Sequence, residues 1–120
     1  MAYVDGFVVP VPKDKRDEYA QKAAEVAQVW KDHGALQVVE CFSDDVPHGK
    51  LTDFYRAVQA EEHEGVVFSW VIWPSKEARD AGNKKIMEDP RMQSTEDMPF
   101  DGKRLIWGGF QVISSTDTLA

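Results

Sequence analysis

Residues 65–73 form the most apolar stretch of the chain, reading Gly-Val-Val-Phe-Ser-Trp-Val-Ile-Trp. Side chains of a strand point alternately to its two faces, so this stretch divides into two rows. One row contains Val66, Phe68, Trp70 and Ile72, and the other contains Val67, Ser69, Val71 and Trp73. Because only Ser69 is polar in either row, the pattern predicts a central strand that is buried on both faces.

Three further stretches, at residues 2–11, 35–43 and 104–113, alternate in the manner of strands. In the first, Pro10 cannot donate a backbone hydrogen bond, which predicts that this end of the strand lies at an edge or a bulge, or is leaving the sheet. In the last, Gly108 and Gly109 indicate a bulge, or a close approach by a ligand or another backbone.

Between the first two strands the hydrophobic period changes from two to 3.6 residues, which predicts a helix over residues 14–33. Asp14 is the expected N-cap, and Gly34 the expected left-handed stop. The apolar stripe of this helix consists of Tyr19, Ala23, Val26, Ala27 and Trp30. A second helix is predicted over residues 76–88, capped by Ser75. Its inner stripe comprises Ala78, Ala81, Gly82 and Ile86.

The segment between the second and third strands is less regular. Residues 52–60 favour a short helix capped by Thr52 or Asp53, although alternation would also allow a strand. Residues 61–64, Glu-Glu-His-Glu, indicate a solvated acidic turn that leads into the central strand.

The order strand–helix–strand occurs twice and predicts an α+β, ferredoxin-like βαββαβ fold with a four-stranded antiparallel sheet. Right-handed crossovers place both helices on one face of the sheet. We expect a single domain over residues 1–113 and a polar tail over residues 114–120. The other face of the central strand has nothing in the chain to cover it, which predicts a homodimer packed sheet to sheet, a dimeric α/β barrel.

Composition narrows the class of protein. The chain has 120 residues and a net charge of −7, so we expect one domain that does not bind nucleic acid. Cys41 is the only cysteine, which excludes an internal disulfide, and its apolar strand predicts a small core residue. The chain shows no targeting segment and no stretch that could span a membrane, so we expect a cytoplasmic protein.

Several segments resemble one bacterial family. They are residues 3–12 (Tyr-Val-Asp-Gly-Phe-Val-Val-Pro-Val-Pro), 38–41, 44–47, 67–70, 73–80 (Trp-Pro-Ser-Lys-Glu-Ala-Arg-Asp), 89–92, 98–104 and 108–110. Together they are similar to the YbaA-like proteins, domain-of-unknown-function family 1428. The resemblance implies membership of the dimeric α/β-barrel superfamily, which includes cofactor-free oxygenases, haem-degrading enzymes, isomerases and stress-response proteins. It implies no catalytic residue, because this branch has none established, and fold alone does not fix chemistry.

Histidines offer little for metal chemistry. His33, His48 and His63 are too far apart for a metal motif, so we predict neither a metal site nor a cofactor. His33 is expected at a helix end and His63 in a surface turn. His48, in a loop near Asp44 and Asp45, is the better candidate for acid–base work, with a solvated loop histidine as the alternative.

Asp5 and Glu40 each interrupt an otherwise apolar strand face. A buried carboxylate has to be paired, hydrogen-bonded or protonated. One interpretation is therefore an ion pair with Arg56, Arg79 or Arg104, or a contact across the dimer. The other is a catalytic carboxylate whose pKa is raised because it faces a pocket.

Aromatic and methionine side chains could line such a pocket. Trp30, Phe68 and Trp70, with Arg56, are the candidate ligand-binding residues, and the aromatic ones would otherwise be core. The methionines at 87, 92 and 98 could lie at a pocket mouth or fill gaps.

These patterns leave three hypotheses for function. The first is a homodimer that binds a small apolar or aromatic ligand. The second is a cofactor-independent oxygenase or isomerase that uses Asp5, Glu40 or His48 as its base. The third is a structural module without a cavity.

Overall fold

The computed structural model describes residues 1–92 and 98–118. Its strands are β1 (Tyr3–Pro12), β2 (Gln37–Phe42), β3 (Glu64–Trp73) and β4 (Ile106–Gln111). Its helices are α1 (Arg16–Asp32), α2 (Phe54–Ala57) and α3 (Lys76–Glu88), and short 3-10 turns at Lys13–Lys15 and Gly102–Arg104 precede α1 and β4. The predicted order of strands and helices is confirmed, and α2 confirms the short helix favoured within residues 52–60.

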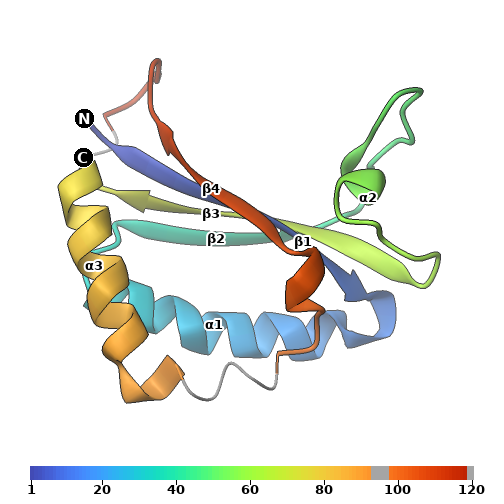
Figure 1. The fold of residues 1–120 in the computed structure, drawn as a ribbon, viewed down its shortest axis with the longest axis horizontal. Helices are drawn as coiled ribbons and strands as arrows, with labels where there is room; N and C mark the ends of the chain where they lie inside the picture. The colour runs from blue at the N-terminus through green and yellow to red at the C-terminus, as the bar shows by residue number, and fades with distance from the viewer. Residues whose placement is uncertain (93–97, 119–120) are drawn as a thin grey trace.

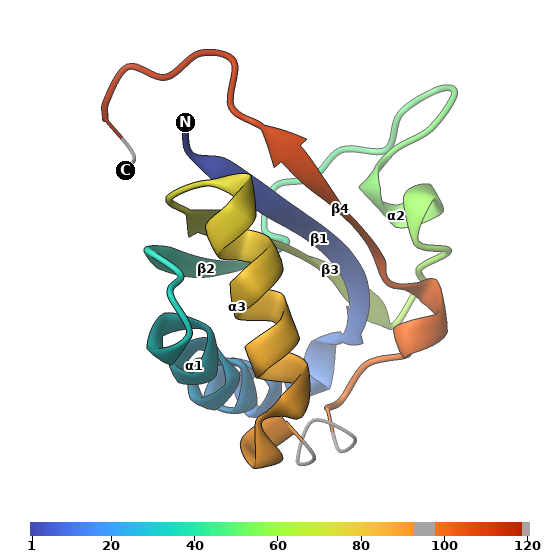
Figure 2. The ribbon, with the colours of Figure 1, turned by 60° about the vertical axis from the view of Figure 1, so that its left-hand side comes forward.

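The four strands form one antiparallel sheet in the order β2-β3-β1-β4. α1 and α3 lie on the same side of this sheet (Figure 1). α2 lies at the end of the sheet that is remote from α3 (Figure 2), where Phe54 packs edge-on against Phe68 of β3. The predicted ferredoxin-like fold is therefore confirmed.

β1 and β3 are the two central strands, paired from Tyr3↔Trp73 to Pro12↔Glu64. Their odd-numbered side chains face the helices and supply much of the core. The buried apolar residues on this side of the two strands are Val9, Val11, Val67, Val71 and Trp73. The even-numbered row of β3 faces the open side, where Val66 and Ile72 are buried but Phe68 is 45% exposed. The isolated chain thus buries one face of its central strand more completely than the other.

Pro10 and the two strand glycines show how β1 meets β4. The β1–β4 pairing ends at Val8↔Ile106, so Pro10 lies beyond it and β1 is an edge at that point, as predicted. The predicted bulge at Gly108 and Gly109 is wrong, because the register continues through both glycines without an inserted residue. A Cβ on Gly109 would collide with Tyr3 and lie 2.7 Å from Arg79 Nη2, so the close approach is made by side chains.

Three of the predicted helix caps are confirmed, and one is wrong. Ser75 accepts a hydrogen bond from the Ala78 amide, Asp53 caps α2, and Gly34 has a φ of +108°. Asp14 is not the N-cap of α1, because it lies in the 3-10 turn that precedes the helix. The Lys13 amide of that turn donates to the carbonyl of His63, the residue before β3, and α1 begins only at Arg16.

α3 packs against the sheet through a narrow line of contacts. Gly82 and Ile86 are buried one turn apart, and a Cβ on Gly82 would lie only 2.7 Å from the His33 carbonyl oxygen. Ala81 was expected on this inner stripe, but it is exposed because it lies about 100° around the helix from Gly82. The close packing expected from small residues therefore depends on the glycine.

Two further predictions about burial are wrong. Cys41 is exposed, because alternation along β2 turns it to the open face while Glu40 turns to the helices. Glu64 was placed in a solvated turn, but it begins β3 and is 4% exposed. Arg104 explains the burial of Glu64, since its Nη1 and Nη2 atoms lie 2.7 Å and 2.8 Å from the two carboxylate oxygens.

Candidate functional site

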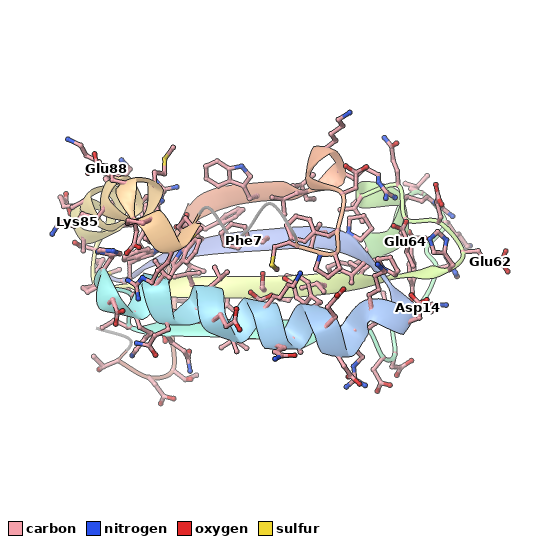
Figure 3. All side chains as sticks on the ribbon, turned by 90° about the horizontal axis from the view of Figure 1, so that it is seen from below. Phe7, Asp14, Glu62, Glu64, Lys85 and Glu88 are labelled. Carbon is pink, nitrogen blue, oxygen red and sulfur yellow. The ribbon has the colours of Figure 1, made fainter. Side chains whose placement is uncertain are left out.

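A cavity of about 240 Å³ lies between α1 and the helix-facing side of the sheet. Figure 3 shows the molecule from that side. α1 runs across the sheet, and Phe7 lies near the middle of the sheet. The lining residues are Phe7, Val9, Tyr19, Ala23, Val26, Ala27, Trp30, Val38, Glu40, Ser69, Val71, Met92, Met98, Phe100 and Leu105. Nearly all of them are apolar, so the cavity is suited to an apolar molecule.

The helical wall of this cavity is the whole predicted stripe of α1. All five stripe residues line it, with a spacing of three or four that keeps them on one face of the helix. Ala23 and Ala27 lie one turn apart in the middle of the stripe. Their methyl side chains leave space between α1 and the strands that larger side chains would fill.

The opposite wall comes from alternate positions of three strands. Phe7 and Val9 lie on β1, Ser69 and Val71 on β3, and Val38 and Glu40 on β2. Met92 and Met98 also line the cavity, together with Phe100 and Leu105, whereas Met87 is 85% exposed. Two of the three methionines therefore lie at the cavity.

One polar cluster interrupts the apolar lining. Tyr19 Oη donates a hydrogen bond of 2.7 Å to Glu40 Oε1. Ser69 lies directly opposite Glu40 in the β2–β3 register and lines the same cavity. No lysine, arginine or histidine is among the described residues that line the cavity. Glu40 is thus stabilised by the neutral hydroxyl donor of Tyr19 and not by a cation.

This environment shifts the acidity of both partners. Burial of its carboxyl group raises the pKa of Glu40, and interactions with Tyr19 and Ser69 offset part of that rise. Burial, followed by the charge of Glu40, raises the pKa of Tyr19. Much of the Glu40 residue is solvent-accessible because β2 is an edge strand, but its carboxyl group lies against the cavity. A carboxylate with a raised pKa is a competent general base.

Trp30 contributes a further polar group to this region. Its indole Nε1 is buried and has no hydrogen-bond partner in the part of the chain that the structure describes. A buried donor without a partner is uncommon in folded proteins. Of the four candidate ligand-binding residues, Trp30 is the one that the structure places at the cavity.

Asp5 lies outside the cavity lining. It is 1% exposed and accepts hydrogen bonds of 3.0 Å from Arg79 Nε and from Trp73 Nε1. Arg79 Nη2 lies 3.0 Å from the same carboxylate, and the guanidinium packs over the ring of Tyr3. This geometry matches the ion-pair interpretation of Asp5.

His48 and Arg56 lie together near α2, away from the cavity. The His48 side chain is 77% exposed, stacks on Tyr55 and lies 3.5 Å from Asp53. Arg56 donates to the carbonyl oxygens of Lys50 and Gly49, which fixes the preceding loop. The structure therefore gives both residues local contacts within one exposed loop.

Phe68 and Trp70 lie on the open face of the sheet, opposite the cavity. Their ring centroids are 5.6 Å apart. Alternation along β3 separates them from Ser69, which points to the helix side. Of the three candidate bases, the structure brings only Glu40 to the cavity, and of the candidate ligand contacts only Trp30.

Among the described residues, no group of three or more histidine, cysteine, aspartate or glutamate side chains is placed to hold a metal ion. Within residues 1–92 and 98–118, no helix combines the length and apolar character that a membrane crossing requires.

The family model "Protein of unknown function (DUF1428)" matches residues 2–102. The chain belongs to this family. It is 61% identical over 114 residues to the uncharacterized protein YbaA of Escherichia coli, which covers 94% of this chain and 97% of that protein. The Shigella flexneri protein of the same name matches over the same length with the same identity.

Two solved structures resemble this DUF1428 chain in fold. One, from Bacillus cereus, is assigned as an antibiotic biosynthesis monooxygenase; it has a TM-score of 0.59 and 11% identity, and covers 98% of both chains. The other is a variant of SnoaB, a cofactor-independent oxygenase from Streptomyces nogalater; it has a TM-score of 0.57 and 10% identity, and covers 97% of this chain and 98% of that one. At such low identities the likeness shows a shared fold only.

Periodicity does not identify two residues of this candidate site. It places Tyr19 in the apolar stripe of α1 and marks Ser69 only as a polar interruption of β3. Each is the one hydroxyl side chain on its apolar face, and that coincidence was an available signal. The contact between Tyr19 and Glu40 spans 21 residues of sequence and depends on how α1 lies on the sheet.

Proposed function

We propose that this protein is a cytoplasmic homodimer that binds a small apolar or aromatic ligand in the cavity between α1 and the sheet. The single observation that carries the ligand proposal is an apolar cavity of about 240 Å³ with a carboxylate cluster on its wall. For comparison, an engineered protein cavity of about 150 Å³ takes up benzene. This cavity would therefore accommodate a substituted ring or two fused rings.

Filling the cavity tests the ligand proposal. The probe is 2-naphthol, an aromatic molecule with one hydroxyl group, titrated calorimetrically into the wild type and two variants. Ala27→Phe places a ring in the cavity, whereas Ala24→Phe makes the same change on the exposed side of α1. We expect binding to the wild type and to Ala24→Phe, and at least about tenfold weaker binding to Ala27→Phe.

Equal binding to the two phenylalanine variants, or no binding to the wild type, would contradict a ligand in this cavity. Native mass spectrometry of protein purified from its own host complements the titration. A bound mass present in the wild type and in Ala24→Phe, but lost from Ala27→Phe, would report the natural ligand at the same place.

The homodimer is supported by the open face of the sheet. Its large side chains include Phe68 and Ile106, each 45% exposed, and Phe110, which is 61% exposed. Apart from Glu64, which is paired with Arg104, the strand positions of that face carry no charged residue, whereas the chain as a whole has a net charge of −7. Two copies would repel each other through most of their surfaces but not through this one. A twofold dimer requires one surface that matches itself, and an uncharged apolar face meets that condition.

Mass in solution tests the dimer. Light scattering during size-exclusion chromatography should give twice the chain mass of 13.6 kDa for the wild type at micromolar concentration. Phe68→Glu introduces a charge on the open face and should give monomers. Met87→Glu introduces the same charge at an exposed position of α3 and should remain dimeric. A wild-type monomer would overturn this part of the proposal.

A second function is favoured by the raised pKa of Glu40. A carboxylate with a raised pKa beside an apolar cavity is suited to take a proton from an enolisable or phenolic substrate. An isomerase would return that proton to a different carbon, and an oxygenase would let the resulting anion react with dioxygen. Either reaction begins with the same proton transfer to Glu40.

Hydrogen exchange tests this first step. The probe is 2-tetralone in deuterated water, where transfer of an α-proton to Glu40 and return of a deuteron gives a mass increase. We expect the wild type to accelerate the exchange and Glu40→Gln to abolish the acceleration. His48→Gln should retain it, because the imidazole is exposed and outside the cavity. No acceleration by the wild type would contradict the enzyme proposal.

A further inference from the structure

The polar cluster of the cavity has an unequal supply of donors and acceptors. The Tyr19 hydroxyl proton is directed to the Glu40 carboxylate. This hydroxyl has one proton to give, so it cannot donate to a ligand while this arrangement lasts. The described lining side chains offer two further polar hydrogens, on Ser69 Oγ and on Trp30 Nε1, and the Trp30 atom is itself buried.

The acceptor capacity of the same cluster is not used up. A carboxylate accepts about four hydrogen bonds, and Tyr19 occupies one of those positions on Glu40. The two hydroxyl oxygens also keep lone pairs that can accept. No cationic side chain among the described lining residues neutralises this end of the cavity. The wall around Glu40 is therefore an array of acceptors beside an apolar space.

We propose that this acceptor array selects a neutral aromatic or enolic ligand that carries an O–H donor, and rejects donor-free and anionic ligands of the same shape. The inference rests on the proposed ligand-binding function and gives it a chemical class. A ligand hydroxyl would donate to Glu40 while its ring lies among the α1 stripe and the strand side chains. A ligand carboxylate would bring a second negative charge beside Glu40 with no cation to offset it.

Three probes with the same two-ring frame test the selection at neutral pH. 2-Naphthol carries the donor, 2-fluoronaphthalene replaces the hydroxyl with a group of similar size that cannot donate, and 2-naphthoate is an anion. We expect the wild type to bind 2-naphthol about tenfold more tightly than 2-fluoronaphthalene, as one hydrogen bond to a charged acceptor allows. Binding of 2-naphthoate should be weaker still.

Variants of the cluster separate selection from simple fit. Glu40→Gln keeps the shape but adds donors to the wall, so the preference for 2-naphthol should fall to about twofold or less. Glu25→Gln removes a carboxylate from the exposed side of α1 and should keep the full preference. Ser69→Ala, which removes a different member of the cluster, provides a second test and should reduce the preference partially.

The possible results distinguish the two proposals. If 2-naphthol and 2-fluoronaphthalene bind the wild type equally and Ala27→Phe weakens both, the cavity binds ligands but the acceptor array does not select them. Binding of 2-naphthoate as tight as that of 2-naphthol would also overturn the selection. If no probe binds the wild type, the ligand-binding function itself fails, and the selection fails with it.

Discussion

Asp5 and Glu40 are both acidic residues on the helix-facing side of the sheet, but their surroundings differ. Asp5, on central strand β1, is held by the Arg79 guanidinium and the Trp73 indole. Glu40, on edge strand β2, accepts a hydrogen bond from the neutral hydroxyl group of Tyr19 at the wall of a cavity. A guanidinium neutralises the first carboxylate and fixes its position. The second keeps free acceptor positions beside an empty space, which is the arrangement expected of a ligand site.

The largest expected effect comes from breaking the Asp5 ion pair. Asp5→Asn removes the buried charge partner of Arg79, whose side chain is only 15% exposed, and leaves its guanidinium paired with the exposed Asp80 alone. Removing one member of a buried pair costs about 3–5 kcal/mol, so we expect a loss of that size in the free energy of unfolding. Urea unfolding of the wild type and the variant measures it.

A double variant controls for this result. Asp5→Asn combined with Arg79→Met removes both charges and should recover part of the lost stability, because no guanidinium remains without its buried charge partner. If Asp5→Asn unfolds at the same urea concentration as the wild type, the contrast between the two carboxylates does not hold.

Glu64 and Arg104 form a second ion pair with a buried carboxylate, like the pair of Asp5 and Arg79. Hydrogen bonding from Arg104 lowers the pKa of Glu64 below its ordinary value of 4.5. The resulting stability is present above pH 4.5 and is lost as the pH falls through the lower pKa of the folded state. We expect Arg104→Met to destabilise the protein by about 2 kcal/mol at neutral pH and to reduce this loss on the acid side. Urea unfolding as a function of pH measures both effects, and an unchanged acid profile would contradict the role of the pair.

Substitution of Glu40 should change the free energy of unfolding least. The pH dependence that Glu40 contributes should have the opposite sign to that of Glu64. Its pKa in the folded state is raised above 4.5, so in the pH range between the two values the folded state binds more protons than the unfolded chain. The contribution of Glu40 to stability therefore falls as the pH rises through that range. Glu40→Gln should remove this fall and leave the protein as stable as the wild type at neutral pH, or slightly more stable, by less than about 1 kcal/mol. Glu25→Gln is the matched control, and a destabilisation of Glu40→Gln as large as that of Asp5→Asn would contradict the comparison.

The sequence predicts the strands and helices of this molecule, and the direction in which their side chains face, better than it predicts contacts between residues far apart in the chain. The two rows of residues 65–73 and the stripe of α1 depend on local periodicity, and both lie where the pattern places them. The ion pair of Asp5 joins residues 74 positions apart, and Glu64 reaches Arg104 over 40 positions. Periodicity carries no information about such pairs, which explains why Glu64 was placed in a solvated turn. The interruption at Glu40 marked the site, but the absence of a cation beside it became visible only in the folded chain.

The comparison between Asp5 and Glu40 is tested most directly by carboxyl-carbon NMR of the wild type during titration with 2-naphthol. If the cavity is the ligand site, the Glu40 carboxyl resonance moves in proportion to bound probe, because its carboxylate lies on the cavity wall. The Asp5 resonance stays in place, because its carboxylate is already held by Arg79 and Trp73. A Glu40 resonance that does not change while 2-naphthol binds would contradict the account.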